Sequence, residues 1–227
     1  MRAAAMLAGL AAVALTAAPS PVGAQAKDWT KSVVATPEGG FRMGNPAAKV
    51  KVIEYASMTC PHCAHFMETG AGPLKERVRT GKVSYELRNF VLNGIDVTAT
   101  LLARCAGPAN FFPLTERLFA TQPQWVAKIS NFSSAEKTKI QAMDQAAQLN
   151  RIATLSGLTQ AAQQFGVTPQ KAQQCLSDKA ALERLGAMYE AGAKMGVTGT
   201  PTFFVNGVKT QAHEWPELAP AIIRAGG

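Results

Sequence analysis

The chain has 227 residues, of which 47% are hydrophobic and 17% are charged. This composition argues against intrinsic disorder and suits one domain, or one domain that carries a large insertion. The formal net charge is +8, but the sequence has no Lys/Arg-rich run of five or more residues and no basic stripe interleaved with aromatic residues. We therefore do not predict binding to nucleic acid.

The first residues have the features of a secretory signal peptide. An uncharged and mainly apolar stretch, residues 3–18, follows Arg2, and Ala24-Gln25-Ala26 places small residues at both positions that a signal peptidase reads. The apolar stretch is shorter than the roughly 20 residues that span a bilayer. We predict a signal peptide over residues 1–26, cleaved after its last alanine, and export to an oxidising compartment.

Export changes the interpretation of the four cysteines, Cys60, Cys63, Cys105 and Cys175. An oxidising compartment permits disulfides, and four cysteines allow three pairings. Cys60 and Cys63 lie so close in sequence that they are expected to pair with each other. Cys105 and Cys175 are then the natural second pair. We expect this pair to be a structural disulfide, and a role in tuning reactivity is the alternative.

Two predicted strands frame the front of the chain. Residues 27–48 contain several glycines and little periodicity, which indicates an extended lead-in with at most one short edge strand. Lys49–Tyr55 is rich in β-branched and apolar residues and is typical of a buried strand. Val83–Val91 is predicted to form a second strand, parallel to the first, at the end of a βαβ unit.

A helix is predicted between these two strands. It should begin at Cys60 or Pro61, because proline is favoured in a first helical turn, where its missing N–H is not needed. Glycines and a proline within residues 70–73 interrupt the helical pattern. We therefore expect a kink there, followed by a second half that ends near Arg79.

The middle of the chain, residues 96–178, is helical in character, with apolar residues at three- and four-residue spacing. Thr168-Pro169 combines a capping residue with a first-turn proline, so a short helix carrying Cys175 is expected to start there. Asp178 is expected to cap the next helix. One face of that helix should carry Leu182, Leu185, Met188 and Met195.

The end of the chain returns to strands. Thr202–Val205 is a short apolar run, and Asn206-Gly207 is the strongest two-residue signal for a hairpin. Val208–Gln211 is the predicted returning strand. A final helix is expected over Trp215–Ala225, with three side chains facing inward: Leu218, Ile222 and Ile223. A βαβ unit and a ββα unit thus flank a helical block.

The Cys60-Pro61-His62-Cys63 motif suits thiol–disulfide exchange. Two intervening residues on a first helical turn keep the thiols close enough to bridge. At a helix N-terminus, free N–H groups and the macrodipole favour an anion, and such positions lower a thiol pKa from about 8.5 to roughly 3.5–7.5. His62 can add a donor or a positive charge beside Cys60. Cys63 lies one turn further in and is the expected resolving thiol.

Two other interpretations of the motif fit less well. A zinc site could draw on Cys60, His62, Cys63 and His65, but structural zinc usually needs a second Cys/His pair, which the sequence lacks. A purely structural Cys60–Cys63 disulfide would close a very small loop and constrain little. We predict no metal and no cofactor, and we interpret His65 and His213 as surface residues.

Two stretches resemble the DsbA-type thiol:disulfide interchange proteins: residues 52–63 (VIEYASMTCPHC) and residues 199–207 (GTPTFFVNG). The resemblance extends over most of the chain. It implies an α/β fold, a thioredoxin fold with an inserted all-helical domain. The implied division is a thioredoxin-like domain made of residues 27–95 and 179–227, with residues 96–178 as the helical insertion.

The resemblance also implies roles for individual residues. Cys60 would be the attacking thiol and Cys63 the resolving one. Pro201 would be cis and lie against the disulfide, and the backbone of Thr200 would pair with a substrate strand. Glu54 matches a buried acidic residue that could relay a proton to Cys63. The alternative for Glu54 is an ordinary charge on an edge strand.

The resulting functional expectation is a monomeric periplasmic oxidase that donates the Cys60–Cys63 disulfide to newly exported, reduced and unfolded polypeptides. The family implies a membrane reoxidase of DsbB type as its partner. Thr200 before the proline also occurs in disulfide isomerases and reductases, so an isomerase or reductase kept in the dithiol form is an alternative. A peptide-binding, chaperone-like module whose dithiol is incidental is the non-enzymatic alternative.

Overall fold

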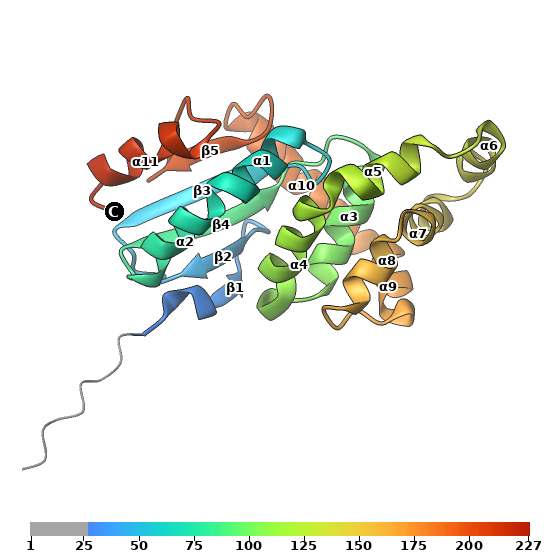
Figure 1. The fold of residues 1–227 in the computed structure, drawn as a ribbon, viewed down its shortest axis with the longest axis horizontal. Helices are drawn as coiled ribbons and strands as arrows, with labels where there is room; N and C mark the ends of the chain where they lie inside the picture. Colours follow the sequence, from blue (N-terminus) through green and yellow to red (C-terminus); the bar gives the residue numbers. More distant parts are fainter. Residues whose placement is uncertain (1–26) are drawn as a thin grey trace, which may run out of the picture.

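The computed structural model describes residues 27–227, so the signal peptide predicted over residues 1–26 lies outside the described part. A six-stranded sheet has the order β1-β2-β4-β3-β5-β6 (Figure 1). The strands are Val33–Ala35 (β1), Phe41–Gly44 (β2), Val50–Ala56 (β3), Val83–Asn89 (β4), Thr202–Val205 (β5) and Val208–Lys209 (β6). β3 and β4 are parallel, and the other neighbouring pairs are antiparallel.

The predicted βαβ unit is confirmed. Between β3 and β4 the chain forms α1 (Pro61–Thr69) and α2 (Ala71–Arg79), with the break at Gly70. A Cβ at Gly70 would lie 2.6 Å from the ring of Phe66, so the close packing of that ring requires glycine. The helix therefore begins and breaks where the sequence indicates.

The extended lead-in was predicted wrongly. Residues 27–48 contain a short 3-10 helix (Trp29–Lys31, η1) and two strands, and β2 lies inside the sheet between β1 and β4. Phe41 and Met43 of β2 are buried in the core. The strand was missed because it is only four residues long and is flanked by glycines, which hide its alternation.

Seven helices follow β4 and lie beside the sheet, with α6 and α7 farthest from the strands (Figure 1). They are Gly94–Cys105 (α3), Pro108–Ala120 (α4), Gln122–Ser130 (α5), Ser134–Gln141 (α6), Gln145–Ser156 (α7), Leu158–Gln163 (α8) and Pro169–Leu176 (α9). The predicted insertion start at residue 96 falls in the first turn of α3. Thr168 and Asp178 cap α9 and the next helix as expected.

The last elements are α10 (Lys179–Lys194), the β5–β6 hairpin and α11 (Trp215–Arg224). The returning strand β6 has two residues rather than the four predicted. Ile223, which was predicted to face inward, is 55% exposed. Met195, which was predicted to share one face with Leu185 and Met188, is 41% exposed. Met195 is the C-cap of α10, so it lies past the end of the buried stripe.

The helices cover the sheet from both sides. On one face, Phe66 of α1 packs on Phe203 of β5 with ring centroids 4.5 Å apart. On the other face, α10 approaches β3 so closely that a Cβ at Gly192 would lie 2.8 Å from the ring of Tyr55. The sheet is thus the middle layer of the fold. No helix within residues 27–227 is long and apolar enough to cross a membrane.

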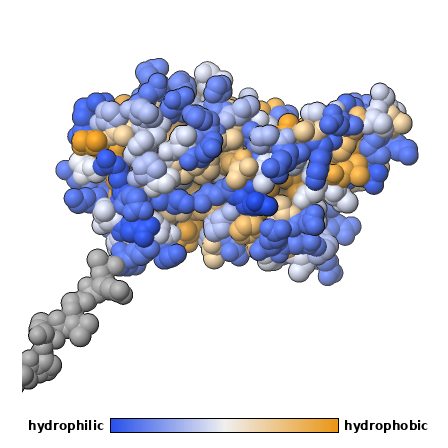
Figure 2. Space-filling model, in the orientation of Figure 1, coloured by the Kyte–Doolittle hydropathy of each residue, from blue (hydrophilic) through white to orange (hydrophobic). Residues whose placement is uncertain are grey.

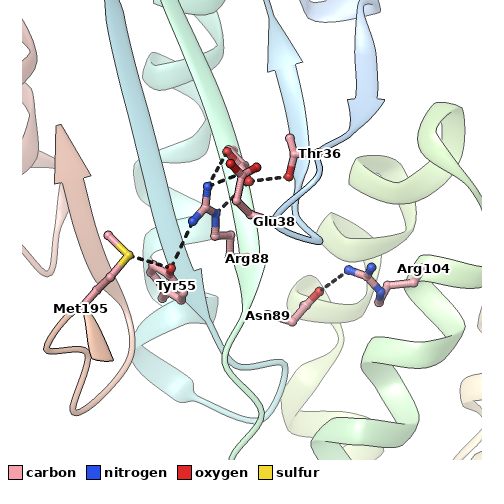
Figure 3. A network of polar contacts seen from close by, with 8 residues as sticks. Thr36, Glu38, Tyr55, Arg88, Asn89, Arg104 and Met195 are labelled. Carbon is pink, nitrogen blue, oxygen red and sulfur yellow. Dashed lines mark hydrogen bonds and ion pairs between the residues drawn. The ribbon is translucent and has the colours of Figure 1, made fainter. Parts of the chain in front are cut away.

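A polar network lies on the α10 face of the sheet (Figure 3). The Arg88 guanidinium donates to Glu86 Oε1 at 2.8 Å and to the Tyr55 hydroxyl at 3.2 Å. The Thr36 hydroxyl donates to the same Glu86 oxygen at 2.7 Å, and the Tyr55 hydroxyl donates to the sulfur of Met195 at 3.5 Å. These bonds satisfy buried charges of β4, which indicates a structural role.

A disulfide joins Cys105, the last residue of α3, to Cys175 of α9 with an S–S distance of 2.04 Å. Its cysteines are 70 residues apart in sequence. In the chain-entropy model, a loop of this size stabilises the fold by at most roughly 4 kcal/mol.

Replacing both Cys105 and Cys175 by serine should therefore lower the melting temperature while the exchange reactivity of Cys60 and Cys63 is retained. Thermal denaturation and alkylation kinetics of the wild-type and double-variant proteins measure the two effects. Loss of reactivity at an unchanged melting temperature would show instead that this disulfide tunes the dithiol.

Candidate active site

The Cys60-Pro61-His62-Cys63 motif lies where β3 passes into α1. Cys60 is the N-cap of α1, and Pro61 is its first helical residue. Cys60 is 8% exposed and Cys63 is fully buried, and both are free thiols, so the structure represents the dithiol form. The thiol at the helix N-terminus is therefore the one that a substrate can reach.

The second motif forms the wall of this site. The Thr200–Pro201 peptide bond is cis, and the Sγ of Cys60 lies 3.2 Å from the carbonyl oxygen of Thr200. Residues 140 positions apart in sequence are thus brought into contact. The loop before β5 and the N-terminus of α1 form one site, as the resemblance implies.

The environment of Cys60 favours the thiolate. The pKa of Cys60 falls from 9.0 to about 5, mainly because the Cys63 thiol donates a hydrogen bond to it. Burial acts against this shift, while the Thr200 hydroxyl and the N–H groups of Cys63 and His62 assist it. Within residues 27–227 the buried Thr200 hydroxyl oxygen has no hydrogen-bond partner, so the hydroxyl is free to donate to a thiolate.

Cys63 has the opposite character. Burial raises its pKa well above 9.0, and the hydrogen bond to Cys60 and the nearby Glu54 raise it further. At neutral pH, Cys60 is therefore a thiolate and Cys63 a thiol. The exposed side chain of His62 contributes less than the sequence suggested, because the bond that lowers the pKa of Cys60 comes from its backbone N–H.

Glu54 lies on the central strand β3 and is fully buried, so the edge-strand interpretation is wrong. The Tyr85 hydroxyl donates to Oε2, and Oε1 has no partner among the described residues. Burial raises the pKa of Glu54 to about 8, although the hydrogen bond from Tyr85 acts in the other direction. At neutral pH Glu54 is mostly protonated and able to exchange a proton.

Comparison with known proteins agrees with this geometry. The family model described as thioredoxin matches residues 36–224. The chain belongs to the thioredoxin family. It is 34% identical over 191 residues to a Rickettsia bellii protein that bears the name of a protein-disulfide oxidoreductase, and the match covers 83% of this chain and 65% of that protein. The chain thus spans just under two thirds of that relative.

Solved structures place the chain among DsbA-type thioredoxin proteins. A protein-disulfide isomerase from Novosphingobium aromaticivorans has a TM-score of 0.75 and 34% identity, with 82% of this chain and 97% of that chain covered. Alpha-DsbA1 from Wolbachia pipientis has a TM-score of 0.61 and 27% identity, with 81% and 89% covered. The thioredoxin fold with inserted helices is therefore shared.

Two residues at this DsbA-type site were not found from the sequence. Asp96 Oδ1 accepts from the backbone N–H of Met58 at 2.9 Å. Gln122 Nε2 donates to the carbonyl oxygens of Met58 and Cys60 at 2.8 Å and 3.0 Å. Both residues are buried although they are polar. Nothing in their local sequence signals this role, because the contacts join segments far apart in the chain.

His213 is exposed, as expected of a surface residue. Its Nδ1 also lies 3.2 Å from the carbonyl oxygen of Pro201, a contact that the sequence did not indicate. His65 is exposed on α1, in agreement with its interpretation as a surface residue. Over residues 27–227, no group of three or more His, Cys, Asp and Glu side chains is placed to hold a metal ion.

A groove of about 550 Å³ starts beside the motif and runs between α1–α2 and α4–α5. Its apolar lining includes Pro61, Ala64, Met67, Phe119 and Pro123. In Figure 2, hydrophobic side chains are visible between the sheet-bearing half and the helical half of the molecule. The site thus adjoins an apolar surface that an unfolded chain could contact.

Proposed function

We propose that this protein is a periplasmic thiol–disulfide oxidoreductase that acts as an oxidase on newly exported polypeptides. The observation that supports it best is the lowered pKa of Cys60 beside the raised pKa of Cys63. A stabilised thiolate exists only in the reduced form, because the disulfide carries no charge. Each pKa unit below ambient pH favours the reduced form by about 30 mV, which makes the disulfide more oxidising.

The Cys60–Cys63 disulfide is the only oxidant that the proposed reaction needs. A substrate thiolate attacks Cys60 Sγ, the Cys60–Cys63 bond breaks, and its electron pair goes to Cys63. Glu54 donates a proton to that sulfur. A second substrate thiolate then attacks the substrate sulfur of the mixed disulfide, which releases Cys60 as a thiolate. The substrate leaves with a disulfide, and the protein holds two electrons as its dithiol.

The proposal extends to the substrate and the partners. The exposed part of Cys60 beside the Thr200–Pro201 loop suits an extended polypeptide that pairs with the backbone of Thr200. Return to the disulfide form needs an external oxidant, for which we propose a membrane reoxidase of DsbB type. We further propose that the protein acts as a monomer.

Isomerase activity is the second candidate, favoured by Thr200 and by the similarity to a structure named as a protein-disulfide isomerase. An isomerase works from the dithiol form and needs a less oxidising disulfide. A chaperone-like binding module would need neither thiol. The three functions differ in what they do to a substrate.

Incubation of the oxidised protein with a reduced, unfolded secretory protein tests the proposal. We expect rapid formation of substrate disulfides, with one dithiol protein produced for each disulfide. An isomerase would instead reactivate a scrambled substrate when supplied in the reduced form. No oxidation of substrate by the wild-type protein, together with substrate protection that persists after both active-site cysteines are replaced by serine, would support the binding module and exclude the oxidase.

A further inference from the structure

The peptide units just before Cys60 are held by the helical insertion. The N–H of Met58 donates to Asp96 of α3 at 2.9 Å, and its carbonyl oxygen accepts from Gln122 of α5 at 2.8 Å. Met58 is 1% exposed, so water cannot readily replace these partners. Both backbone groups thus depend on side chains that come from outside the strand and helix that frame the motif.

Gln122 contacts a second backbone group as well. The same amide nitrogen also donates to the carbonyl oxygen of Cys60 at 3.0 Å. That oxygen accepts the first hydrogen bond of α1, from the N–H of Ala64 at 3.2 Å. Gln122 is 4% exposed and contacts the start of the active-site helix from a largely buried position at the edge of the groove.

The helix before α5, α4, packs firmly on the sheet. Phe111 of α4 stacks on Phe41 of β2 with ring centroids 4.0 Å apart. Phe112 of the same helix packs against Tyr85 of β4 at 5.5 Å. Since α5 starts two residues after α4 ends, Gln122 is held in a defined place above the loop.

We propose that Gln122 is a positioning residue through which the helical insertion sets the reactivity of the Cys60 thiol. This inference rests on Cys60 being the exchanging thiol. The carbonyl oxygens of Met58 and Cys60 carry partial negative charge in the segment that holds Cys60, and the N–H groups that Gln122 donates offset it. The same bonds hold the backbone so that Cys60 stays at the N-terminus of α1, near the N–H groups of His62 and Cys63.

Removal of the amide should therefore disfavour the thiolate. The two carbonyl oxygens lose their donor, and the loop before Cys60 is free to turn. We expect the pKa of Cys60 to rise and the equilibrium with glutathione to move toward the disulfide form. The inserted helices would then influence the pKa of Cys60 and the redox equilibrium of the site, as well as cover the site.

Gln122→Met tests this inference, because methionine has nearly the same size and cannot donate. Gln122→Asn keeps an amide that is one methylene shorter, so it can hold at most one of the two carbonyls. Gln124→Met is the matched control, since Gln124 lies on the same helix and is exposed. The titratable groups around the site, Cys63 and His62 on α1, Glu54 on β3 and Asp96 on α3, are unchanged in all three variants.

The readouts are the thiolate absorbance at 240 nm across pH and the equilibrium constant with glutathione, measured beside thermal melting. For Gln122→Met we expect a rise of about one pH unit in the pKa of Cys60 and a shift of about tenfold toward the disulfide form. Gln122→Asn should lie between the wild-type and methionine proteins, and it carries the test if the methionine variant does not fold.

Unchanged pKa and equilibrium constant in a folded Gln122→Met or Gln122→Asn protein would overturn the inference, as would an equal shift in Gln124→Met. Failure of this inference can be distinguished from failure of the proposed oxidase function. An isomerase would show the same dependence on Gln122 from a different starting potential.

Discussion

Replacing Cys63 by serine should trap the protein as a mixed disulfide. With a pKa of about 5, Cys60 is about 99% thiolate at pH 7 and attacks an added disulfide. In the wild-type protein Cys63 then displaces the added thiol and closes the Cys60–Cys63 bond. Serine cannot do so. After incubation with oxidised glutathione, mass spectrometry should find nearly every Cys63→Ser molecule carrying one glutathione.

Cys60→Ser is the matched control for the trap. Cys63 is fully buried and its pKa lies well above 9.0, so less than about 1% of it is thiolate at pH 7. The variant should remain unmodified on the same timescale and should oxidise substrates no faster than the reaction without protein. Rapid glutathione addition to Cys63 in this variant would reverse the assignment of the two thiols.

Glu54→Gln should slow each exchange step in which Cys63 gains or loses its proton, by about 100-fold at pH 7. Glutamine has the same size and can still accept from Tyr85, but it cannot transfer a proton. In the wild-type protein the oxidation of substrate should slow as pH rises toward 8, because Glu54 then loses the proton that it donates. The pKa of about 8 includes repulsion from the Cys60 thiolate and is an upper bound for the mixed disulfide, in which Cys60 carries no charge. The glutamine variant should lack this decline in stopped-flow measurements.

Glu86→Gln is the control for this effect. Glu86 is a buried carboxylate on β4, paired with Arg88 on the opposite face of the sheet. Its loss should change stability and leave the pH dependence of exchange in place. If Glu54→Gln retains the decline near pH 8, Glu54 is not the proton donor.

The raised pKa of Glu54 also affects stability. In the folded protein it is about 8, against 4.5 for the ordinary side chain. In the reduced protein, the contribution of Glu54 to the free energy of unfolding should therefore be largest below pH 4.5. It should fall by up to about 5 kcal/mol as the pH rises to 8, at about 1.4 kcal/mol per pH unit. Glu54→Gln should remove this loss in denaturant titrations at several pH values.

The parts of the site that were predictable are those with strong local signals. Pro61 marks the start of α1, and the apolar run before it marks β3, so the placement of Cys60 at a helix N-terminus follows from a short stretch of sequence. Asn206-Gly207 likewise predicts the hairpin after β5. In each case neighbouring residues determine the backbone, and distant contacts only reinforce it.

The parts that were missed depend on contacts between distant segments. β2 has four residues and gains its stability from pairing with β4 and from the ring of Phe111. Gln122 is one of many glutamines in a polar helical region, and only its burial against the loop of Met58 distinguishes it. Such residues acquire their role from the packing of the insertion, which local propensity does not report.

The pH dependence of the equilibrium between the Cys60–Cys63 disulfide and glutathione tests the central claim most directly. If Cys60 is a stabilised thiolate with a pKa of about 5, the dithiol holds one proton rather than two above that pH. The reduction potential should then fall by about 60 mV per pH unit below pH 5 and by about 30 mV per pH unit from there to pH 8. A slope of about 60 mV per pH unit that continues unbroken to pH 8 would contradict the account.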